Sequence, residues 1–269
     1  MLEVRPPAVA GLFYPGRAPE LRAALGALIP PPRAAATTRP PKILIVPHAG
    51  YVYSGRTAGR AYALLAPFRA QITRVVMLGP AHRVWVRGAA IPTVDSFATP
   101  LGDVPLDRAV LAWLRTQPDI VESDAAHAAE HALEVQLPFL QTVLDRFTLV
   151  PLAVGDLGYP TLADVLAALW GGDETLIVVS SDLSHYHRYE VAQTIDRATV
   201  DRILALDDGI DHDQACGATP INAALLAAKG AHLRPRLLEL CNSGDTAGDR
   251  DRVVGYCAIA FEGEFHARH

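Results

Sequence analysis

Two histidines follow apolar segments that have the composition of buried strands, and together they could bind a metal ion. The segment PKILIVPHAGY places His48 shortly after Val46, and the segment TRVVMLGPAH places His82 shortly after Leu78. Continuous apolar runs of this kind are typical of parallel strands that are buried on both faces. In open α/β sheets, ligands bind at the carboxyl ends of the strands. Two imidazoles delivered there from separate strands are well placed to coordinate a transition metal.

A third apolar segment, TLIVV, leads directly into the polar sequence SSDLSHYH. Polar groups at the end of a buried strand need hydrogen-bond partners or water, so packing does not explain this cluster. Within it, Asp182 and His185 could form a carboxylate–imidazole pair in which the carboxylate orients the ring or raises its basicity. We therefore predict that both residues are catalytic, with His185 transferring protons near neutral pH.

A cysteine precedes the helix that the segment CGATPINAALL predicts. Cys216 lies just before Thr219, where the helix is expected to start. A thiolate near a helix N-terminus is stabilised by the local positive field, so we expect a lowered pKa that favours metal ligation or nucleophilic chemistry. The alternative is an inert buried thiol. The other two cysteines, Cys241 and Cys257, lie within apolar strands and are expected in the core.

A fifth segment, AEHALEVQLPF, carries ionisable residues on an expected helix. Glu130 and Glu134 would share one face of this helix, whereas His131 is offset from them. The spacing matches no zinc-binding helix motif. Two interpretations stay open: these residues support the metal site or contact substrate, or they cap the helix or lie on its surface. The histidines in other polar or helical contexts are expected at the surface, and they are His127, His187, His212 and His232.

The alternation of strands and helices predicts a single three-layer α/β domain over residues 1–269, with a central, largely parallel or mixed sheet. We expect strands at residues 42–46, 74–78, 88–92, 148–155, 175–179, 234–244 and 252–263. We expect helices at residues 18–29, 106–116, 160–169 and 189–206, one capped by Ser54, one over 128–147 kinked at Pro138, and one from Thr219 to Gly230. A proline-rich connector, residues 30–41, precedes the first of these strands.

Composition narrows the functional classes. Half of the 269 residues are hydrophobic, which allows a sizeable core. The net charge of -5 and the absence of a basic block argue against a nucleic-acid partner. No apolar run approaches the roughly 20 residues that a membrane helix needs, so we expect no membrane partner. The N-terminus lacks the pattern of a signal peptide, and three cysteines fit a reducing compartment, so we expect a cytoplasmic protein.

Several motifs occur together and in order, namely PAVAGLFYP, PHAGYVYSG, LGPAHR, EHALEVQLPFL, VVSSDLSHY and CGATPI. With them the chain resembles the Memo family, whose fold is similar to that of the class III extradiol dioxygenases. The resemblance implies one metal ion, iron(II) or copper first and zinc second, bound by His48, His82 and Cys216. It places Asp182 and His185 beside that metal. It also implies a radical-SAM protein and an AMMECR-type protein as partners, in the system called AmmeMemoRadiSam.

Three functions are compatible with these residues. The first is a metal-dependent oxidoreductase or dioxygenase-like enzyme, although a cysteine in place of the usual third carboxylate ligand makes simple extradiol ring cleavage doubtful. The second is a non-catalytic module that binds a peptide or protein in the same pocket. The third is a cysteine hydrolase that uses Cys216 with His185 and Asp182, and it leaves both strand-tip histidines without a role.

Overall fold

A large mixed sheet forms the centre of the molecule, as the sequence predicts. The computed structural model describes residues 2–31 and 39–263, and within them nine strands pair in the order β10-β12-β2-β9-β3-β8-β4-β7, with β11 beside β12. The strands are β2 (Ile43–Val46), β3 (Arg74–Pro80), β4 (Ala89–Ile91), β7 (Ile120–Glu122), β8 (Thr148–Val154), β9 (Thr175–Ser180), β10 (His185–His187), β11 (Arg234–Asn242) and β12 (Val253–Glu262).

The four central strands, β2, β9, β3 and β8, run parallel to one another. Strand β12 is antiparallel to β2, and β4 is antiparallel to β8, so the sheet is mixed at both sides of its parallel centre. Nearly every residue of the four parallel strands is buried, because helices cover both faces. This burial explains why their sequences are continuous runs of valine, isoleucine and leucine.

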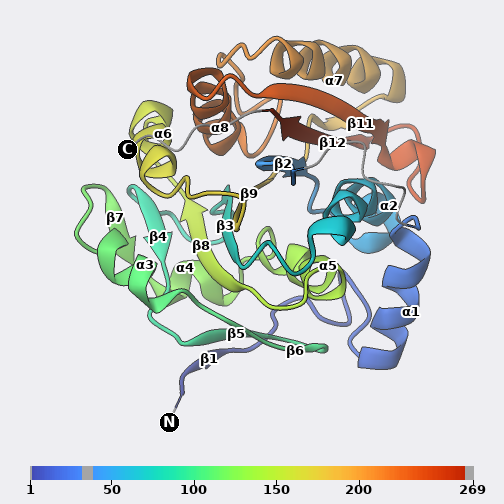
Figure 1. Ribbon diagram of the computed structural model, residues 1–269. Helices are drawn as coiled ribbons and strands as arrows, with labels where there is room; N and C mark the ends of the chain where they lie inside the picture. Colours follow the sequence, from blue (N-terminus) through green and yellow to red (C-terminus); the bar gives the residue numbers. More distant parts are fainter. Residues whose placement is uncertain (1, 32–38, 264–269) are drawn as a thin grey trace.

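Helices cover the sheet on both sides, which gives the three predicted layers (Figure 1). One layer consists of α1 (Ala18–Leu28), α2 (Tyr51–Tyr62) and α5 (Leu137–Val143), and the other of α6 (Tyr159–Ala168), α7 (Tyr189–Leu204) and α8 (Ala218–Gly230). Two short helices, α3 (Arg108–Leu114) and α4 (Asp124–Ala128), and three 3-10 turns, η1 (Ala63–Phe68), η2 (Glu134–Gln136) and η3 (Ser243–Asp245), complete the helical elements that the structure describes. None of these helices is long and apolar enough to span a membrane.

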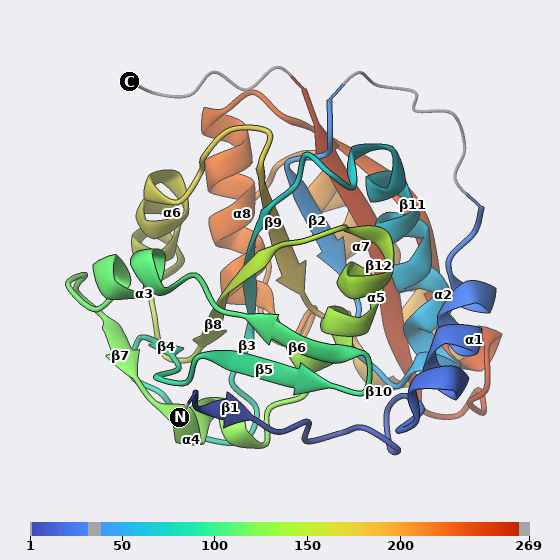
Figure 2. The same ribbon diagram turned by 60° about the horizontal axis from the view of Figure 1, so that its bottom comes forward.

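The N-terminal segment belongs to a second, smaller sheet that the sequence did not predict. Strand β1 (Val4–Arg5) pairs with β5 (Ser96–Thr99), which in turn pairs with β6 (Gly102–Pro105). Figure 2 shows this sheet in front of the main sheet, with the N-terminus at its edge. The chain then runs from β1 toward α1 along the lower edge of the molecule in this view.

Two helix predictions are wrong in informative ways. Helix α2 begins at Tyr51 with Gly50 as its N-cap, so Ser54 lies inside the helix and donates its hydroxyl hydrogen to the carbonyl of Ala49. The expected kinked helix over residues 128–147 is instead α4, an irregular stretch, η2 and α5. Pro138 lies in the first turn of α5, where its missing N–H has no intrahelical partner to lose. The connector at residues 30–41 lies in part outside the described residues.

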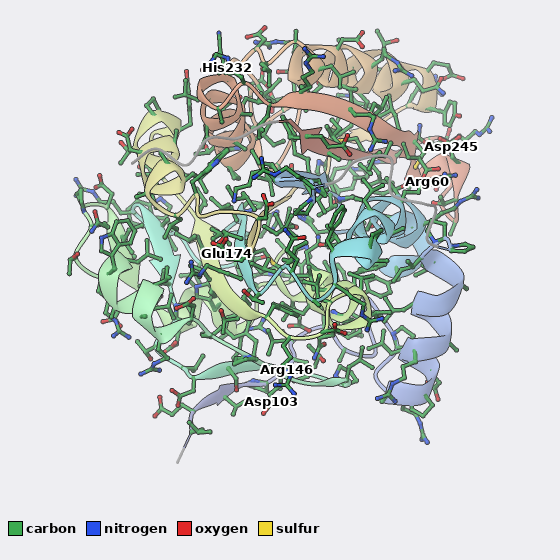
Figure 3. The ribbon with its side chains drawn as sticks, in the orientation of Figure 1. Arg60, Asp103, Arg146, Glu174, His232 and Asp245 are labelled. Atoms are coloured by element: carbon green, nitrogen blue, oxygen red, sulfur yellow. The ribbon has the colours of Figure 1, made fainter. Side chains whose placement is uncertain are left out.

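Glu174, labelled in Figure 3, directly precedes β9 and marks the amino end of the parallel strands. Its carboxylate accepts hydrogen bonds from the Gly172 N–H and the Thr175 hydroxyl. Three of the residues predicted to do chemistry, His48, His82 and Asp182, follow the opposite ends of these strands.

Candidate metal centre

The carboxyl ends of three neighbouring parallel strands bring the predicted residues together. His48 follows β2, Asp182 follows β9 and His82 follows β3, while β9 lies between the other two strands. The imidazole rings of His48 and His82 have their centroids 5.2 Å apart. A third ring, that of His131, lies 5.3 Å from His48 and 4.9 Å from His82. One nitrogen from each of these three histidines lies within 4.8 Å of the others, a grouping that could hold a metal ion.

The orientation of the His48 ring follows from the hydrogen bonds of Ser180. The Ser180 hydroxyl lies 2.6 Å from the Ala132 carbonyl oxygen, to which it donates its single hydrogen. It must therefore accept from its other partners, and these are Nδ1 of His48 at 3.0 Å and Nε2 of Gln136 at 2.9 Å. Consequently His48 carries its proton on Nδ1 and presents the lone pair of Nε2. Burial, with the neighbouring His82 and His131, holds the pKa of His48 well below its usual range, so this ring is neutral near pH 7.

The carboxylate of Glu130 orients His82. Its Oε1 lies 3.0 Å from Nδ1 of His82, and its Oε2 accepts the His82 backbone N–H at 2.6 Å. The Ala132 N–H donates to the same carboxylate at 2.9 Å. Burial alone would raise the pKa of Glu130, but its contacts with His131, His82 and the Ala132 N–H outweigh burial and hold the pKa far below its usual range. The charged carboxylate leaves Nε2 of His82 as the nitrogen free for a ligand.

His131 occupies a position that the sequence interpretation did not foresee. It lies on the irregular stretch before η2 rather than on a helix, and its ring packs against Phe13 at 4.9 Å between centroids. Its Nδ1 lies 3.2 Å from Oε1 of Glu130 but outside hydrogen-bond geometry, and this buried atom has no hydrogen-bond partner in the described chain. His131 was predicted only as a supporting residue, and the structure groups it directly with His48 and His82.

Cys216 lies beside the histidines, at the turn that precedes α8. Its Sγ is 3.3 Å from Nε2 of His48 and 3.7 Å from the Asp182 carbonyl oxygen. Burial, and then the charge of Asp182, raise the pKa of the thiol to about 12, so the expected lowering near a helix N-terminus is wrong. Glycine at position 217 lets the backbone of this turn pack closely against Ser181, because a Cβ there would lie 2.7 Å from Cβ of Ser181. Cys216 is not part of the three-histidine group, and its role as a metal ligand stays a prediction.

Asp182 and His185 contribute to the site in different ways. The Asp182 carboxylate is buried, and its Oδ1 accepts the His48 backbone N–H at 2.7 Å. Burial raises the pKa of this carboxyl group. His185 is half-buried on β10, and no hydrogen bond within the described chain joins it to Asp182. The two side chains therefore line one site without forming the direct pair that the sequence suggested.

A cavity of about 770 Å³ opens over these residues. Asp182, Cys216 and the three grouped histidines form one part of its wall. The rest of the lining is Arg83, His185, Tyr186, His187, His212 and Asp213. A second cavity of about 690 Å³ lies between α7 and β11 and contains none of the predicted site residues.

Glu134 serves the N-terminal segment instead of the metal centre. Its carboxylate pairs with Nη1 of Arg5 at 2.8 Å, and both side chains are almost fully buried. It also accepts the backbone N–H groups of Ala8 and Val9 and the hydroxyl of Tyr14. This carboxylate therefore fastens residues 5–14 to the wall that carries His131.

Other sequence expectations have mixed outcomes. His127 is buried, so its assignment to the surface is wrong: its Nε2 contacts the Ala90 carbonyl at 3.0 Å, and burial lowers its pKa to about 4. His212 is exposed, as expected. Cys257 is buried in β12, whereas Cys241 is only half-buried beside Thr57. Gln136, a buried polar residue in an apolar stretch, was missed although that contrast was visible in the sequence.

The donor set fits a transition metal. Two imidazoles have their Nδ1 atoms engaged and their Nε2 lone pairs available, and a third has a buried nitrogen without a hydrogen-bond partner. Imidazole ligands supported by a carboxylate suit zinc, copper and iron. The fold and this site together define the class of the protein: an α/β protein with a histidine-rich candidate metal centre at the carboxyl edge of its sheet.

Comparison with known families identifies the family of the chain. The family model for Memo-like proteins matches residues 5–260, so the chain belongs to the Memo-like family. It is 34% identical to a MEMO1 family protein of Metallosphaera sedula, covering 96% of this chain and 99% of the relative. A MEMO1 family protein of Methanopyrus kandleri is 36% identical, with coverage of 96% and 98%.

A solved structure is similar in fold. An uncharacterized protein from Escherichia coli K12 superposes with a TM-score of 0.55 at 15% identity, covering 80% of this chain and 98% of that chain. At this identity the likeness bears on the fold alone. It agrees with the mixed, mostly parallel sheet flanked by helices.

Proposed function

We propose that the protein is a metal-dependent oxidoreductase whose metal ion is bound at the three-histidine site. The observation that carries this proposal is the approach of one nitrogen each from His48, His82 and His131 to within 4.8 Å at the wall of a cavity. Three protein ligands on an open cavity leave coordination positions for a substrate. Cys216 is the candidate for a fourth protein ligand, because its Sγ lies 3.3 Å from Nε2 of His48.

Iron(II) or copper is the ion that best suits this proposal, and zinc is the alternative. A bound iron or copper ion would supply Lewis acidity and one-electron chemistry to a substrate in the cavity. A thiolate makes the site softer than a site of two histidines and one carboxylate. Since the pKa of Cys216 is raised to about 12 without metal, its ligation would release a proton.

The side chains around the ion have separate tasks. Glu130 orients His82 through Nδ1, and Ser180 orients His48 through Nδ1. Asp182 holds the backbone N–H of His48 and so fixes the strand end that carries this ligand. His185 lines the cavity, half-buried, and is the candidate to hold or move a proton of the substrate.

Metal analysis tests the proposal. Protein purified without a histidine tag, anaerobically and under reducing conditions, should contain one transition metal per chain. His48→Ala, His82→Ala and His131→Ala should each lose it, whereas His212→Ala, which changes another histidine of the cavity, should retain it. Wild-type protein that binds no transition metal after reconstitution with iron(II), copper or zinc would contradict the proposal.

A non-catalytic binding module remains the second candidate. Tyr186 lines the same cavity and is 63% exposed, as expected of a side chain that contacts a peptide or protein. Turnover distinguishes the two: oxygen consumption with catechols or small thiols by the metal-loaded protein supports the enzyme. The cysteine hydrolase has less support, since the imidazole beside Cys216 is that of His48. A radical-SAM protein and an AMMECR-type protein remain proposed partners.

A further inference from the structure

The outer part of the metal cavity carries a cationic side chain that forms no ion pair. Arg83 lines the cavity and directly follows His82, on the loop after β3. Its guanidinium has neither a hydrogen bond nor an ion pair with any residue that the structure describes. Many other arginines of the protein do pair with carboxylates, as Arg69 does with Asp145 and Arg74 with Asp107. The guanidinium of Arg83 is therefore available to a ligand beside the metal centre.

The carboxylates of the cavity do not neutralise Arg83. Asp182 is buried and accepts the backbone N–H of His48. Asp213 is exposed, comes from the loop before α8, and lies beyond ion-pair distance of Arg83. A guanidinium offers paired N–H donors that match a carboxylate or phosphate, so its preferred partner is an anion.

Tyr186, which also lines the cavity, has features that favour contact with a ligand. Its φ is +62°, a left-handed conformation that a bulky residue rarely adopts, and the pairing of β10 with β12 is irregular between His185 and His187. The guanidinium of Arg252 lies 5.0 Å from the centre of the Tyr186 ring. Non-glycine residues in this conformation concentrate at functional sites. The exposed ring gives the cavity an apolar surface besides its polar groups.

From these features we propose that the cavity takes a small organic anion, whose charged group pairs with Arg83 while its apolar body contacts Tyr186. This assignment deepens the proposed function and rests on it, because it names the chemical class of the substrate at the same site. The anion would enter between the loop after β3 and strand β10 and place its remaining polar group toward the three histidines.

Probe binding tests the assignment with three molecules of similar size and different charge. Benzoate, the neutral benzamide and the cationic benzylamine are titrated into metal-loaded and metal-free protein by calorimetry. The expected result is a preference of about tenfold for benzoate over benzamide, which corresponds to about 1.4 kcal/mol. Arg83→Gln should reduce that preference to about twofold or less, since one charge-assisted contact is lost.

Arg87→Gln is the matched control, because Arg87 is exposed on the same loop but does not line the cavity. It should leave the preference for benzoate unchanged, and both variants should melt at the wild-type temperature. Tyr186→Ala should weaken benzoate and benzamide alike. Equal binding of benzoate and benzamide by the wild-type protein, no binding of either, or preference for benzylamine would overturn the assignment. Its failure is separable from that of the proposed function, because metal content is measured on the same samples.

Discussion

Glu130 and Glu134 are four residues apart in the sequence, and both carboxylates are buried, yet they serve different regions of the molecule. Glu130 contacts His82 and His131 at the metal centre. Glu134 pairs with Arg5 and fastens the N-terminal segment. A buried carboxylate in a motif is therefore not by itself a functional residue. Both carboxylates accept backbone N–H groups, and what separates them is their side-chain partners: imidazoles for Glu130, a guanidinium and a tyrosine hydroxyl for Glu134.

The largest effect on stability should come from Glu134. Glu134→Gln would leave the buried guanidinium of Arg5 without its counter-charge, and breaking a buried pair in this way costs about 3–5 kcal/mol. The free energy of unfolding from urea titrations checks this value. Glu20→Gln removes an exposed ion pair with Arg17 and should cost less than about 0.5 kcal/mol. Metal content of the folded Glu134→Gln protein should stay at the wild-type level, and a loss of metal would erase the distinction between the two carboxylates.

Glu130→Gln should reverse this pattern. The amide keeps the size of the side chain but removes the charge that orients His82 and His131. Loss of such a supporting contact typically lowers metal affinity by roughly 10–100-fold. Competition with a chelator of known affinity measures the change. Stability of the metal-free variant should fall by about 1–2 kcal/mol, because the amide oxygen still accepts from a backbone N–H. A metal affinity equal to that of the wild type would show that Glu130 is structural, as Glu134 is.

Much of this site follows from the sequence, and the parts that do not have physical reasons. His48, His82 and Asp182 were found because parallel strands must deliver their following residues to one edge of the sheet. Helical spacing could not separate Glu130 from Glu134, since the segment forms no continuous helix and Pro138 starts α5 rather than kinking a longer helix. The pKa of Cys216 was predicted in the wrong direction because burial of the thiol depends on the packing of distant segments.

The same dependence on long-range contacts explains the missed burial of His127. Arg5 donates to the His127 carbonyl oxygen at 2.7 Å. The imidazole ring of His127 packs near Phe97, which belongs to the small sheet. None of these partners is close to His127 in the sequence, so local polarity gave the wrong answer. The order of the main-sheet strands β2, β3, β4, β8, β9, β11 and β12, by contrast, depends on local periodicity and was predicted, whereas the strands of the small sheet were missed.

The pH dependence of stability should also differ between wild type and Glu130→Gln. Contacts with His131, His82 and the Ala132 N–H hold the pKa of Glu130 below its unfolded value of 4.5. A carboxyl group whose folded pKa is depressed contributes stability that is fully present above the unfolded pKa. That contribution is lost as the pH falls below 4.5 toward the folded pKa. Urea titrations of metal-free protein should show a constant difference between the two proteins above this pH and a shrinking difference below it.

The smallest effect should be the coupling between the two carboxylates. Arg5 touches both regions, because its Nη1 pairs with Glu134 while its Nη2 donates to the backbone carbonyl of Glu130 at 2.8 Å. This link reaches the main chain of Glu130 and leaves its carboxylate alone, so the two side chains should act almost independently. In a double-mutant cycle of Glu130→Gln and Glu134→Gln, the interaction energy in unfolding should be about 0.5 kcal/mol or less. A coupling several times larger would mean that Arg5 transmits strain between the N-terminal segment and the metal centre, and the two carboxylates would then form one functional unit.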